Sequence, residues 1–312
     1  MRAAFSESLI ELAKNDPKVL LLTGDHGYEL FDKFRIQYPA QYINAGIAEQ
    51  NMVGMAAGLA KVGFRPFVYG LSAFIPVRVI EQIKLDIAHD NLPVVLIGDG
   101  AGFVYSHLGT SHQSTEDIAC TRSIPNISIF SPSDRFEVTA CMAEMYRSKS
   151  TCYIRLGKSD RGDVHTSDII NPLCIQKVRE GSANSSVTIV ATGSMVVTAL
   201  KLASTSLLTA EVWSAPCLKP FDVVNLSRIV DKPHRTVVVL EEHSIYGGLG
   251  SIVAELAAEY GTAKVLRLGV KDRFSDMCGS YDYLLREHGL DISSVVEQTS
   301  TFFNGIENAK RD

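Results

Sequence analysis

The sequence lacks several features that would restrict its function class at once. Its six cysteines are scattered without a Cys-X-X-Cys pair, so we predict reduced thiols and expect neither a metal site nor a redox pair from them. No apolar run reaches membrane-spanning length, and the first eight residues contain no apolar signal core. These absences favour a cytoplasmic protein.

Basic charge is also scarce. The chain has 30 Lys and Arg residues against 35 Asp and Glu, a net charge of -5, and no basic stripe. Nucleic acids and anionic membranes are therefore poor candidates as partners. The length of 312 residues, with 46% hydrophobic residues and no internal repeats, is enough for two globular domains that each have a core.

Short apolar runs alternate with helical patterns along the first half of the chain. The run Val19–Leu22, closed by Thr23–Asp25, is typical of a buried parallel strand. Further strands are predicted at residues 42–44, 67–69, 94–97 and 127–130, and helices at residues 5–14, from Glu49 onward and at 80–88. This alternation predicts an α/β fold with a mainly parallel sheet flanked by helices.

A second α/β unit begins near residue 187. The preceding segment is rich in Gly, Pro, Ser and Asp without periodicity, so it is predicted to be a linker with one strand near residues 173–178. Strands are expected at 187–191, 211–213, 236–240 and 265–267, with helices from Met195 and at 223–230 and 250–259. We therefore divide the chain into a first domain at 1–160, a linker at 161–185 and a smaller second domain at 186–312.

One acidic residue, Glu49, stands at the start of a small-residue apolar helix. Gly54 and Gly58 are four residues apart, so they share a helix face and allow another backbone to approach, across a domain or subunit contact. Taken alone, the segment leaves two interpretations of Glu49 open. It is either a functional acid or a first-turn acid that the helix dipole favours and that faces water.

The string Gly-Ile-Ala-Glu-Gln-Asn at residues 46–51 resembles the pyrimidine-binding domain of the transketolase and deoxyxylulose-phosphate synthase family of thiamine diphosphate enzymes. Other short motifs extend the resemblance over nearly the whole chain. They are Arg65-Pro66-Phe67-Val68, Phe74 with Arg78 and Glu81-Gln82-Ile83, Gly109-Thr110-Ser111-His112-Gln113, Ser131-Pro132-Ser133-Asp134, Tyr153-Ile154-Arg155, Glu241-Glu242-His243 and Gly247-Gly248-Leu249-Gly250-Ser251. Their order and spacing together carry the resemblance.

The resemblance implies a thiamine diphosphate cofactor, whose ring acts as an electron sink. Glu49 is then the catalytic acid, hydrogen-bonded to the aminopyrimidine so that its imino tautomer forms. Phe74 is expected to stack on that ring, with Ile47 and Arg78 as further cofactor-binding residues. The simpler alternatives are a core phenylalanine for Phe74 and a solvated helix arginine for Arg78.

Three histidines and one arginine are candidates for substrate contact. His112 lies where transketolases carry a histidine that faces the substrate, in a loop that belongs to no helix or strand, so we predict a catalytic and substrate-binding role. His107 and His26 are candidates for the same site, against a role in surface loops. Arg155 resembles the family's anion-binding arginine, against a surface salt bridge.

The sequence departs from the family at two substrate positions. Leu108 stands where transketolases that act on sugar phosphates carry an aspartate, and Gly100 stands where the synthases carry an arginine. An apolar side chain cannot accept a hydrogen bond from a sugar hydroxyl. The resemblance therefore leaves open a different or bulkier donor or acceptor, such as a modified sugar, and does not decide whether the substrate is phosphorylated or nucleotide-linked.

Two motifs imitate other binding sites. Gly98-Asp99-Gly100 with Asn126 resembles the motif by which these enzymes bind Mg²⁺ and diphosphate, but its second asparagine is missing and it lies in the wrong domain, so we assign no metal ligands to this chain. Gly247–Gly250 resembles a nucleotide-binding loop. In this family it is a packing turn at a helix start.

The resemblance covers the pyrimidine-binding and C-terminal domains of the family. It does not extend to the family's diphosphate-binding domain, which we therefore expect to be absent from this chain. It implies the C-terminal subunit of a split transketolase-like transferase, which transfers a two-carbon ketol unit from a ketose to an aldehyde. A separate N-terminal-half subunit would bring Mg²⁺ and the diphosphate contacts, in an assembly of two copies of each chain. The alternatives are the β subunit of a 2-oxo acid dehydrogenase E1 and a non-catalytic regulatory subunit on a retained fold.

Overall fold

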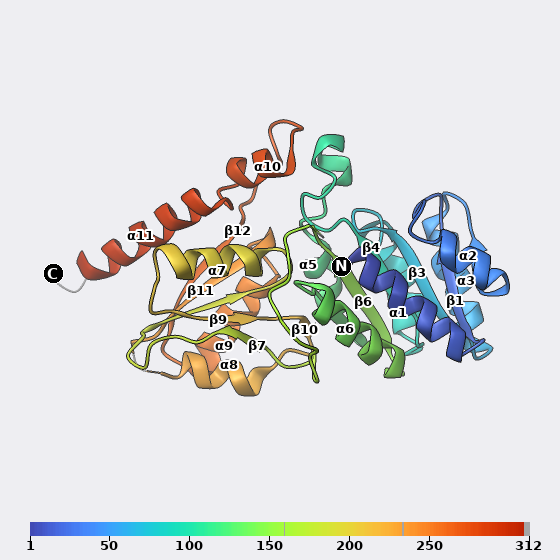
Figure 1. Cartoon of the computed structure of the whole chain (residues 1–312), viewed down its shortest axis with the longest axis horizontal. Coiled ribbons are helices and arrows are strands. Elements are labelled where there is room, and N and C mark those ends of the chain that lie inside the picture. Colours follow the sequence, from blue (N-terminus) through green and yellow to red (C-terminus); the bar gives the residue numbers. More distant parts are fainter. Residues whose placement is uncertain (159, 233, 309–312) are drawn as a thin grey trace.

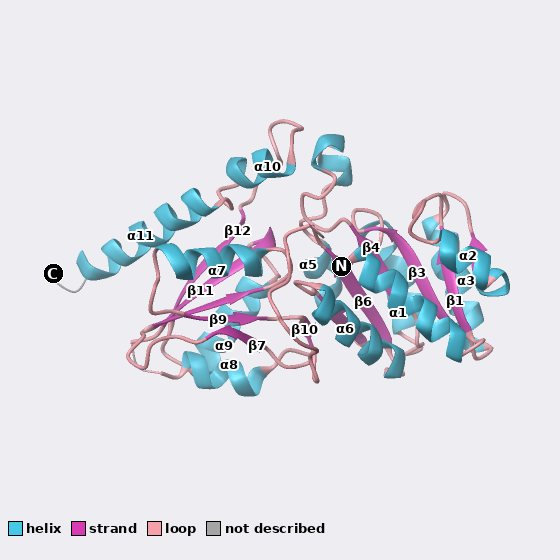
Figure 2. Cartoon of the chain, in the orientation of Figure 1, coloured by secondary structure: helices cyan, strands magenta, loops and turns pink. Residues whose placement is uncertain are grey.

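The computed structural model describes residues 1–158, 160–232 and 234–308. It contains two sheets, each mostly parallel and each flanked by helices (Figures 1 and 2). The predicted α/β class with two sheet-based domains is confirmed. Among the described helices, none is both long and apolar enough to cross a lipid bilayer.

The first sheet has the strand order β10-β5-β6-β4-β3-β1-β2. Six of its strands come from the first half of the chain and pair in parallel: β1 (Val19–Thr23), β2 (Tyr42–Asn44), β3 (Arg65–Leu71), β4 (Val95–Asp99), β5 (Ile127–Phe130) and β6 (Thr151–Leu156). Every residue of β1, β4 and β6 is buried. Burial on both faces explains why these strands are continuous apolar runs rather than alternating patterns.

Helices cover both faces of this sheet. They are α1 (Arg2–Asn15), α2 (Asp32–Gln37), α3 (Glu49–Lys61), α5 (Asp117–Arg122) and α6 (Arg135–Arg147), with short turns η1 (Pro39–Gln41), η2 (Val77–Val79), η4 (Ser106–Leu108) and η5 (Thr110–His112). α1 packs beside α6 on one face, and α3 packs against the other. The helix predicted at residues 80–88 consists of α4 (Ile80–Gln82) followed by a π-helical segment, η3 (Ile83–Ala88).

The second sheet has the order β12-β11-β8-β9-β7. Its strands are β7 (Gln176–Arg179), β8 (Val187–Ala191), β9 (Glu211–Ser214), β11 (Thr236–Ser244) and β12 (Lys264–Val270). The flanking helices are α7 (Met195–Thr205), α8 (Val223–Val230), α9 (Leu249–Tyr260), α10 (Tyr281–Glu287) and α11 (Ile292–Asn308). β7 lies at the place expected for a strand within the linker, and it pairs antiparallel with β9.

The two domains share backbone hydrogen bonds. β10 (Cys217–Lys219) follows β9 in the chain, yet it pairs antiparallel with β5 at the edge of the first sheet. The sequence analysis did not predict β10, nor the helices α10 and α11. The second domain is thus joined to the first through a strand, in addition to side-chain contacts.

Candidate active site

Glu49 begins α3 at a turn that the local sequence determines. The Asn44 side chain accepts a hydrogen bond from the backbone N–H of Gly46, whose φ of +71° suits glycine. The apolar face of α3, including Met52 and Val53, packs into the core beneath the sheet. Glu49 itself is 5% exposed, so it does not face water as a simple first-turn acid would.

A single arginine contacts both Glu49 and Phe74. Nη1 of Arg78 donates to Oε2 of Glu49 at 3.0 Å, and the guanidinium carbon lies 3.9 Å from the centroid of the Phe74 ring. The salt bridge and the cation–π contact hold these three side chains together. Within the described part of the chain, Oε1 of Glu49 has no hydrogen-bond partner.

Two histidines extend this group. The ring centroid of His112 lies 5.3 Å from that of Phe74 in an edge-to-face arrangement, and the His26 centroid lies 6.3 Å from Phe74. Nε2 of His26 is buried and has no partner within the described ranges. Nδ1 of His112 is hydrogen-bonded to Oγ of Ser111 at 2.9 Å.

These side chains come from loops that follow three neighbouring strands. His26 follows β1, Phe74 follows β3 and His112 lies in the segment after β4, and these strands are adjacent in the sheet. The carboxyl ends of parallel strands are where open α/β sheets place ligands. Five predicted residues far apart in sequence (26, 49, 74, 78 and 112) therefore form one group near the carboxyl ends of these strands.

Two predicted residues lie near this group without a recorded contact to it. Ile47 is 73% exposed in the turn that precedes Glu49. His107 is exposed in η4, in the same loop as His112. The roles of Ile47 in cofactor binding and of His107 in substrate contact therefore stay predictions.

Arg155 lies apart from the group, inside the protein. Its side chain is 4% exposed, Nε donates to Oδ2 of Asp117 at 2.8 Å, and Nη2 donates to the carbonyls of Ser114 and Glu242 at 3.3 Å each. The surface salt bridge considered for Arg155 is therefore ruled out by its burial. Because its guanidinium already faces a carboxylate and two carbonyls, we do not carry Arg155 into the proposed substrate site.

Asp99 and Asn126, the two residues of the apparent metal motif, have separate structural roles. Oδ2 of buried Asp99 accepts from the hydroxyls of Tyr69 and Tyr105 at 2.9 Å each and lies 3.2 Å from Nη2 of Arg2. Burial and the nearby Asp99 raise the pKa of Tyr105 above its usual value. Asn126 donates to the carbonyl of Ala88. In the described ranges, no three His, Cys, Asp or Glu side chains are placed to hold a metal ion.

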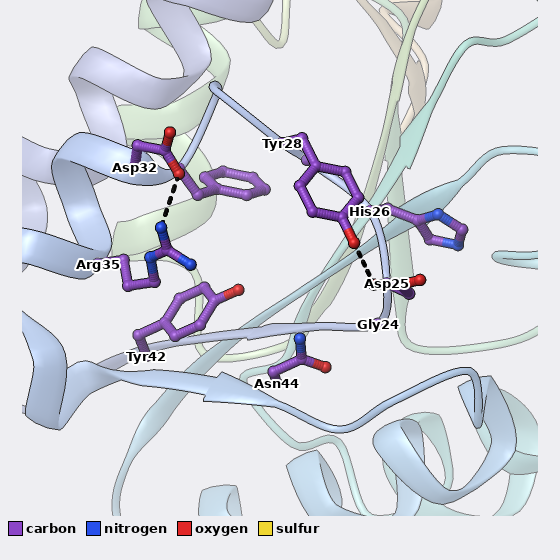
Figure 3. Close-up of a pocket in the computed structure, with 10 residues that line it drawn as sticks. Gly24, Asp25, His26, Tyr28, Asp32, Arg35, Tyr42 and Asn44 are labelled. Atoms are coloured by element: carbon purple, nitrogen blue, oxygen red, sulfur yellow. Dashed lines mark hydrogen bonds and ion pairs between the residues drawn. The ribbon is translucent and has the colours of Figure 1, made fainter.

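A small polar pocket lies on the other side of the loop that carries His26 (Figure 3). Its volume is ≈ 50 Å³, and its lining includes Asp25, Tyr28, Arg35 and Tyr42. The Tyr28 hydroxyl donates to Asp25 at 2.5 Å, and the His26 ring points away from Arg35 and Tyr42. No sequence motif marks this pocket, because its residues come from a strand, a helix and a loop.

Two family models match the chain in succession. Residues 1–162 match the family described as transketolase, pyrimidine binding domain, and residues 176–295 match the transketolase C-terminal domain.

Several relatives are similar over almost their full length. A putative transketolase C-terminal section from Methanocaldococcus jannaschii is 34% identical, with 96% of this chain and 94% of the relative covered. A 6-deoxy-6-sulfo-D-fructose transketolase subunit from a Clostridium species is 33% identical, with 95% and 92% covered. A solved structure described as a split gene transketolase, inactive beta4 tetramer, is 34% identical with a TM-score of 0.86, covering 96% of this chain and 97% of that chain.

Proposed function

The chain belongs to the transketolase family, and on that premise we propose that it is the C-terminal-half subunit of a split transketolase. The observation that carries the proposal is the buried Glu49 beside Phe74 and His112 at the carboxyl ends of adjacent strands. The similarity to a C-terminal section and to a transketolase subunit over nearly their whole lengths supports the split organisation.

The residues of the group fit the aminopyrimidine half of thiamine diphosphate. A buried carboxylate with one oxygen free of partners in the described structure can hydrogen-bond a ring nitrogen, and the Phe74 ring offers an apolar stacking surface. Arg78 occupies Oε2 of Glu49 and one face of the Phe74 ring, so Oε1 is the oxygen that would face the cofactor ring. When bound, the cofactor supplies the carbanion that takes up the ketol unit.

Each side chain of the group has a distinct role in this proposal. Glu49 would hold the proton at the pyrimidine nitrogen, and its burial would keep water from competing for that hydrogen bond. Phe74 would orient the ring. His112, at the edge of Phe74, would face the substrate and serve as a proton donor or acceptor there.

The diphosphate and its Mg²⁺ are proposed to bind on a partner subunit that corresponds to the N-terminal half of transketolase. The chain matches the pyrimidine-binding and C-terminal domains, which supply the other half of such a site. The related structure described as an inactive beta4 tetramer supports the view that such a chain is not active alone. The proposed active assembly contains two copies of each subunit.

The glycine face of α3 is the proposed contact surface in this assembly. A Cβ placed on Gly54 or Gly58 would meet no atom within 4 Å, so this helix face is open in the chain as described. The neighbouring η3 exposes Leu85 to 53%, and Ile47 is exposed in the turn that precedes α3. Two exposed glycines on one helix face, with apolar residues beside them, suit close packing against another subunit.

The proposed reaction is transfer of a two-carbon ketol unit from a ketose to an aldehyde. Leu108 is apolar and 47% exposed in the loop of His112, at the position where the family resemblance leads us to expect an aspartate for a sugar-phosphate substrate. We therefore propose a donor or acceptor that is not an ordinary aldose phosphate. The name of the Clostridium relative, which specifies a sulfonated deoxyketose, supports testing modified sugars first.

Calorimetric titration tests the shared site directly. Thiamine diphosphate with Mg²⁺ is titrated into this chain alone and into its mixture with a candidate N-terminal-half subunit. Tight binding in the mixture alone is expected. Equally tight binding to the isolated chain would overturn the proposed division between subunits.

Turnover by the reconstituted assembly separates the reaction classes. Ketol transfer requires both a ketose donor and an aldehyde acceptor, and it releases no CO₂. Decarboxylation of a 2-oxo acid without any sugar acceptor would instead identify a component of a 2-oxo acid dehydrogenase.

A further inference from the structure

A loop of the first domain, residues 102–114, carries both His107 and His112; we call it the histidine loop. Its two ends are joined by backbone hydrogen bonds, from Gly102 N to Ser114 O at 2.8 Å and from Ser114 N to Gly102 O at 3.0 Å. In Figure 1 the loop projects as a teal segment beside α10 of the second domain. The loop is closed at its base, but its tip has no strand or long helix of its own to fix it.

The second domain holds the start of the loop through Glu242 in β11. Oε1 of Glu242 accepts a hydrogen bond from Phe103 N at 2.6 Å. Its other oxygen is fixed in turn by the hydroxyls of Ser194 and Tyr281, the latter at 2.5 Å. A Cβ on Gly102, whose φ is +68°, would overlap this carboxylate, so the glycine allows its close approach.

The second domain also contacts the middle and the end of the loop. Oγ of Ser275 donates to Oε1 of Gln113, the residue after His112, at 2.8 Å. A Cβ on Gly109 would lie 2.9 Å from Sγ of Cys278, so this part of the loop packs closely against the segment before α10. The His288 ring stacks on Phe103 with centroids 4.8 Å apart. Three separate segments of the second domain therefore touch the loop.

The base of the loop is connected to the turn that carries Phe74. Oγ of Ser114 is hydrogen-bonded to Oγ of Ser72 at 2.7 Å, two residues before Phe74. Arg155 bridges the carbonyls of Ser114 and Glu242, and all of these side chains are buried. One buried polar network thus links the turn that carries Phe74 and the histidine loop to the second domain.

We propose that Glu242 is a positioning residue, through which the C-terminal domain fixes His112 relative to Phe74. This inference rests on the proposed function, since it assigns His112 a task at the site. Its physical basis is that a hydrogen bond from a backbone N–H to a buried carboxylate is stronger than one between neutral groups. Loss of the carboxylate would leave Phe103 N–H buried without a partner and would release the start of the loop.

Hydrogen–deuterium exchange tests whether Glu242 restrains the histidine loop, and it requires neither cofactor nor partner subunit. In Glu242→Ala, backbone amides of residues 103–113 are expected to exchange roughly tenfold faster or more, as loss of a hydrogen bond to a charged group implies. The matched control is Glu241→Ala. Glu241 is equally buried in the same strand but accepts from Leu249 N and Gly250 N at the start of α9, away from the loop.

Unchanged exchange in Glu242→Ala, or equal changes in both variants, would overturn the proposal. If Glu242→Ala does not fold, Tyr281→Phe replaces it, because that variant removes one of the two groups that fix the carboxylate. Glu242→Gln keeps an acceptor for Phe103 N and is expected to restore slow exchange.

Kinetics of the reconstituted assembly test the effect on catalysis. Glu242→Ala is expected to lower kcat roughly tenfold or more with the affinity for thiamine diphosphate unchanged, because Glu49 and Phe74 lie outside the loop. Faster exchange with unchanged turnover would overturn the positioning role and leave the proposed function intact. The exchange result stands by itself if no ketol transfer is found at all.

Discussion

At the scale of single residues, the carboxylate of Glu49 carries the proposed chemistry. Glu49→Gln keeps the size of the side chain but removes the proton that the ring nitrogen needs, so turnover of the reconstituted complex should fall about 10²- to 10⁴-fold. The measurement is steady-state ketol transfer, with thiamine diphosphate binding followed in parallel. Glu81→Gln, an exposed glutamate in α4, is the matched control. Full activity of Glu49→Gln would favour the regulatory subunit.

Two buried residues of β11, Glu241 and His243, have pKa values that are shifted in opposite directions. Burial lowers the pKa of His243 to about 4, with Asp117 opposing and Arg155 reinforcing the shift, and His243 Nε2 accepts a bond from Ala119 N of the first domain. Burial raises the pKa of Glu241 to about 7, against two backbone hydrogen bonds from α9. Each shift corresponds to about 3 kcal/mol of folding free energy.

The signs predict that these two residues contribute opposite pH dependences to the stability of the native chain. The unfolded state binds more protons at His243 between about pH 4 and 6.5, so this residue removes stability as pH falls through that range. The folded state binds more protons at Glu241 between about pH 4.5 and 7, so this residue removes stability as pH rises. The two effects oppose each other where the ranges overlap.

Urea unfolding between pH 4.5 and 7 tests this compensation. His243→Gln should lose stability as pH rises, and Glu241→Gln should lose stability as pH falls. Parallel profiles for the two variants and the native chain would contradict the prediction, whatever the absolute stabilities are.

Residue roles that depend on distant partners could not be predicted. Glu49, Phe74 and His112 are predicted site residues because short motifs mark them, and the structure brings them into one group. For Arg155 the sequence predicts substrate contact, because the residue resembles the family's anion-binding arginine. Its actual partners, Asp117 and Glu242, lie 38 and 87 positions away in the sequence, and only the folded chain brings them together.

At the scale of elements, Asp134 at the start of α6 has more than one task. Oδ1 accepts from Glu137 N as a helix cap, while Oδ2 accepts from the backbone N–H groups of Val164 and His165. Asp134→Ala should therefore cost about 3 kcal/mol of unfolding free energy, since it removes a cap and leaves further N–H groups unpaired. Ser280→Ala, which removes the α10 cap alone, should cost about 1 kcal/mol.

Denaturant unfolding of both variants checks this difference. Equal losses would mean that the contacts to the segment after β6 add nothing to the cap. The His165 ring, whose Nδ1 lies 3.0 Å from Oδ2 of Asp134, provides an internal check, because its raised pKa should return toward the usual value when Asp134 is removed.

Elements with strong local patterns were predictable and those defined by pairing were not. Apolar runs identified β1 and β8, because strands buried on both faces need no alternation. β10 is three residues long between Pro216 and Pro220, so nothing in its composition indicates a strand. It exists because the edge of the first sheet offers β5 as a partner. The apolar pattern of residues 80–88 predicts a helix, but it does not distinguish the π-helical segment η3 from an α-helix.

At the scale of the whole molecule, the second domain does more than pack beside the first. It adds β10 to the first sheet and supports the histidine loop through Glu242, Ser275 and the segment at Cys278. The two domains therefore act as one support for the candidate site.

The glycine face of α3 predicts opposite effects of one substitution on the subunit and on its assembly. In the isolated chain, Gly54→Gln should raise stability by about 0.5 kcal/mol, because glutamine is a better helix former and a Cβ meets no atom there. In the assembly, the same side chain would occupy the space that a neighbouring backbone needs, and association should weaken.

Gly305→Gln is the matched control for this prediction, because Gly305 is also in a helix, α11, with open space around its Cβ position. Both variants should gain similar stability in urea unfolding of the dilute chain. Light scattering of each variant mixed with the partner subunit should then show a smaller assembly for Gly54→Gln alone. If both variants assemble as the native chain does, α3 is not the contact surface, and the open glycine face requires another explanation. Because both substitutions put the same side chain at an open helical position, weaker assembly of Gly54→Gln alone would indicate that a neighbouring chain packs against α3.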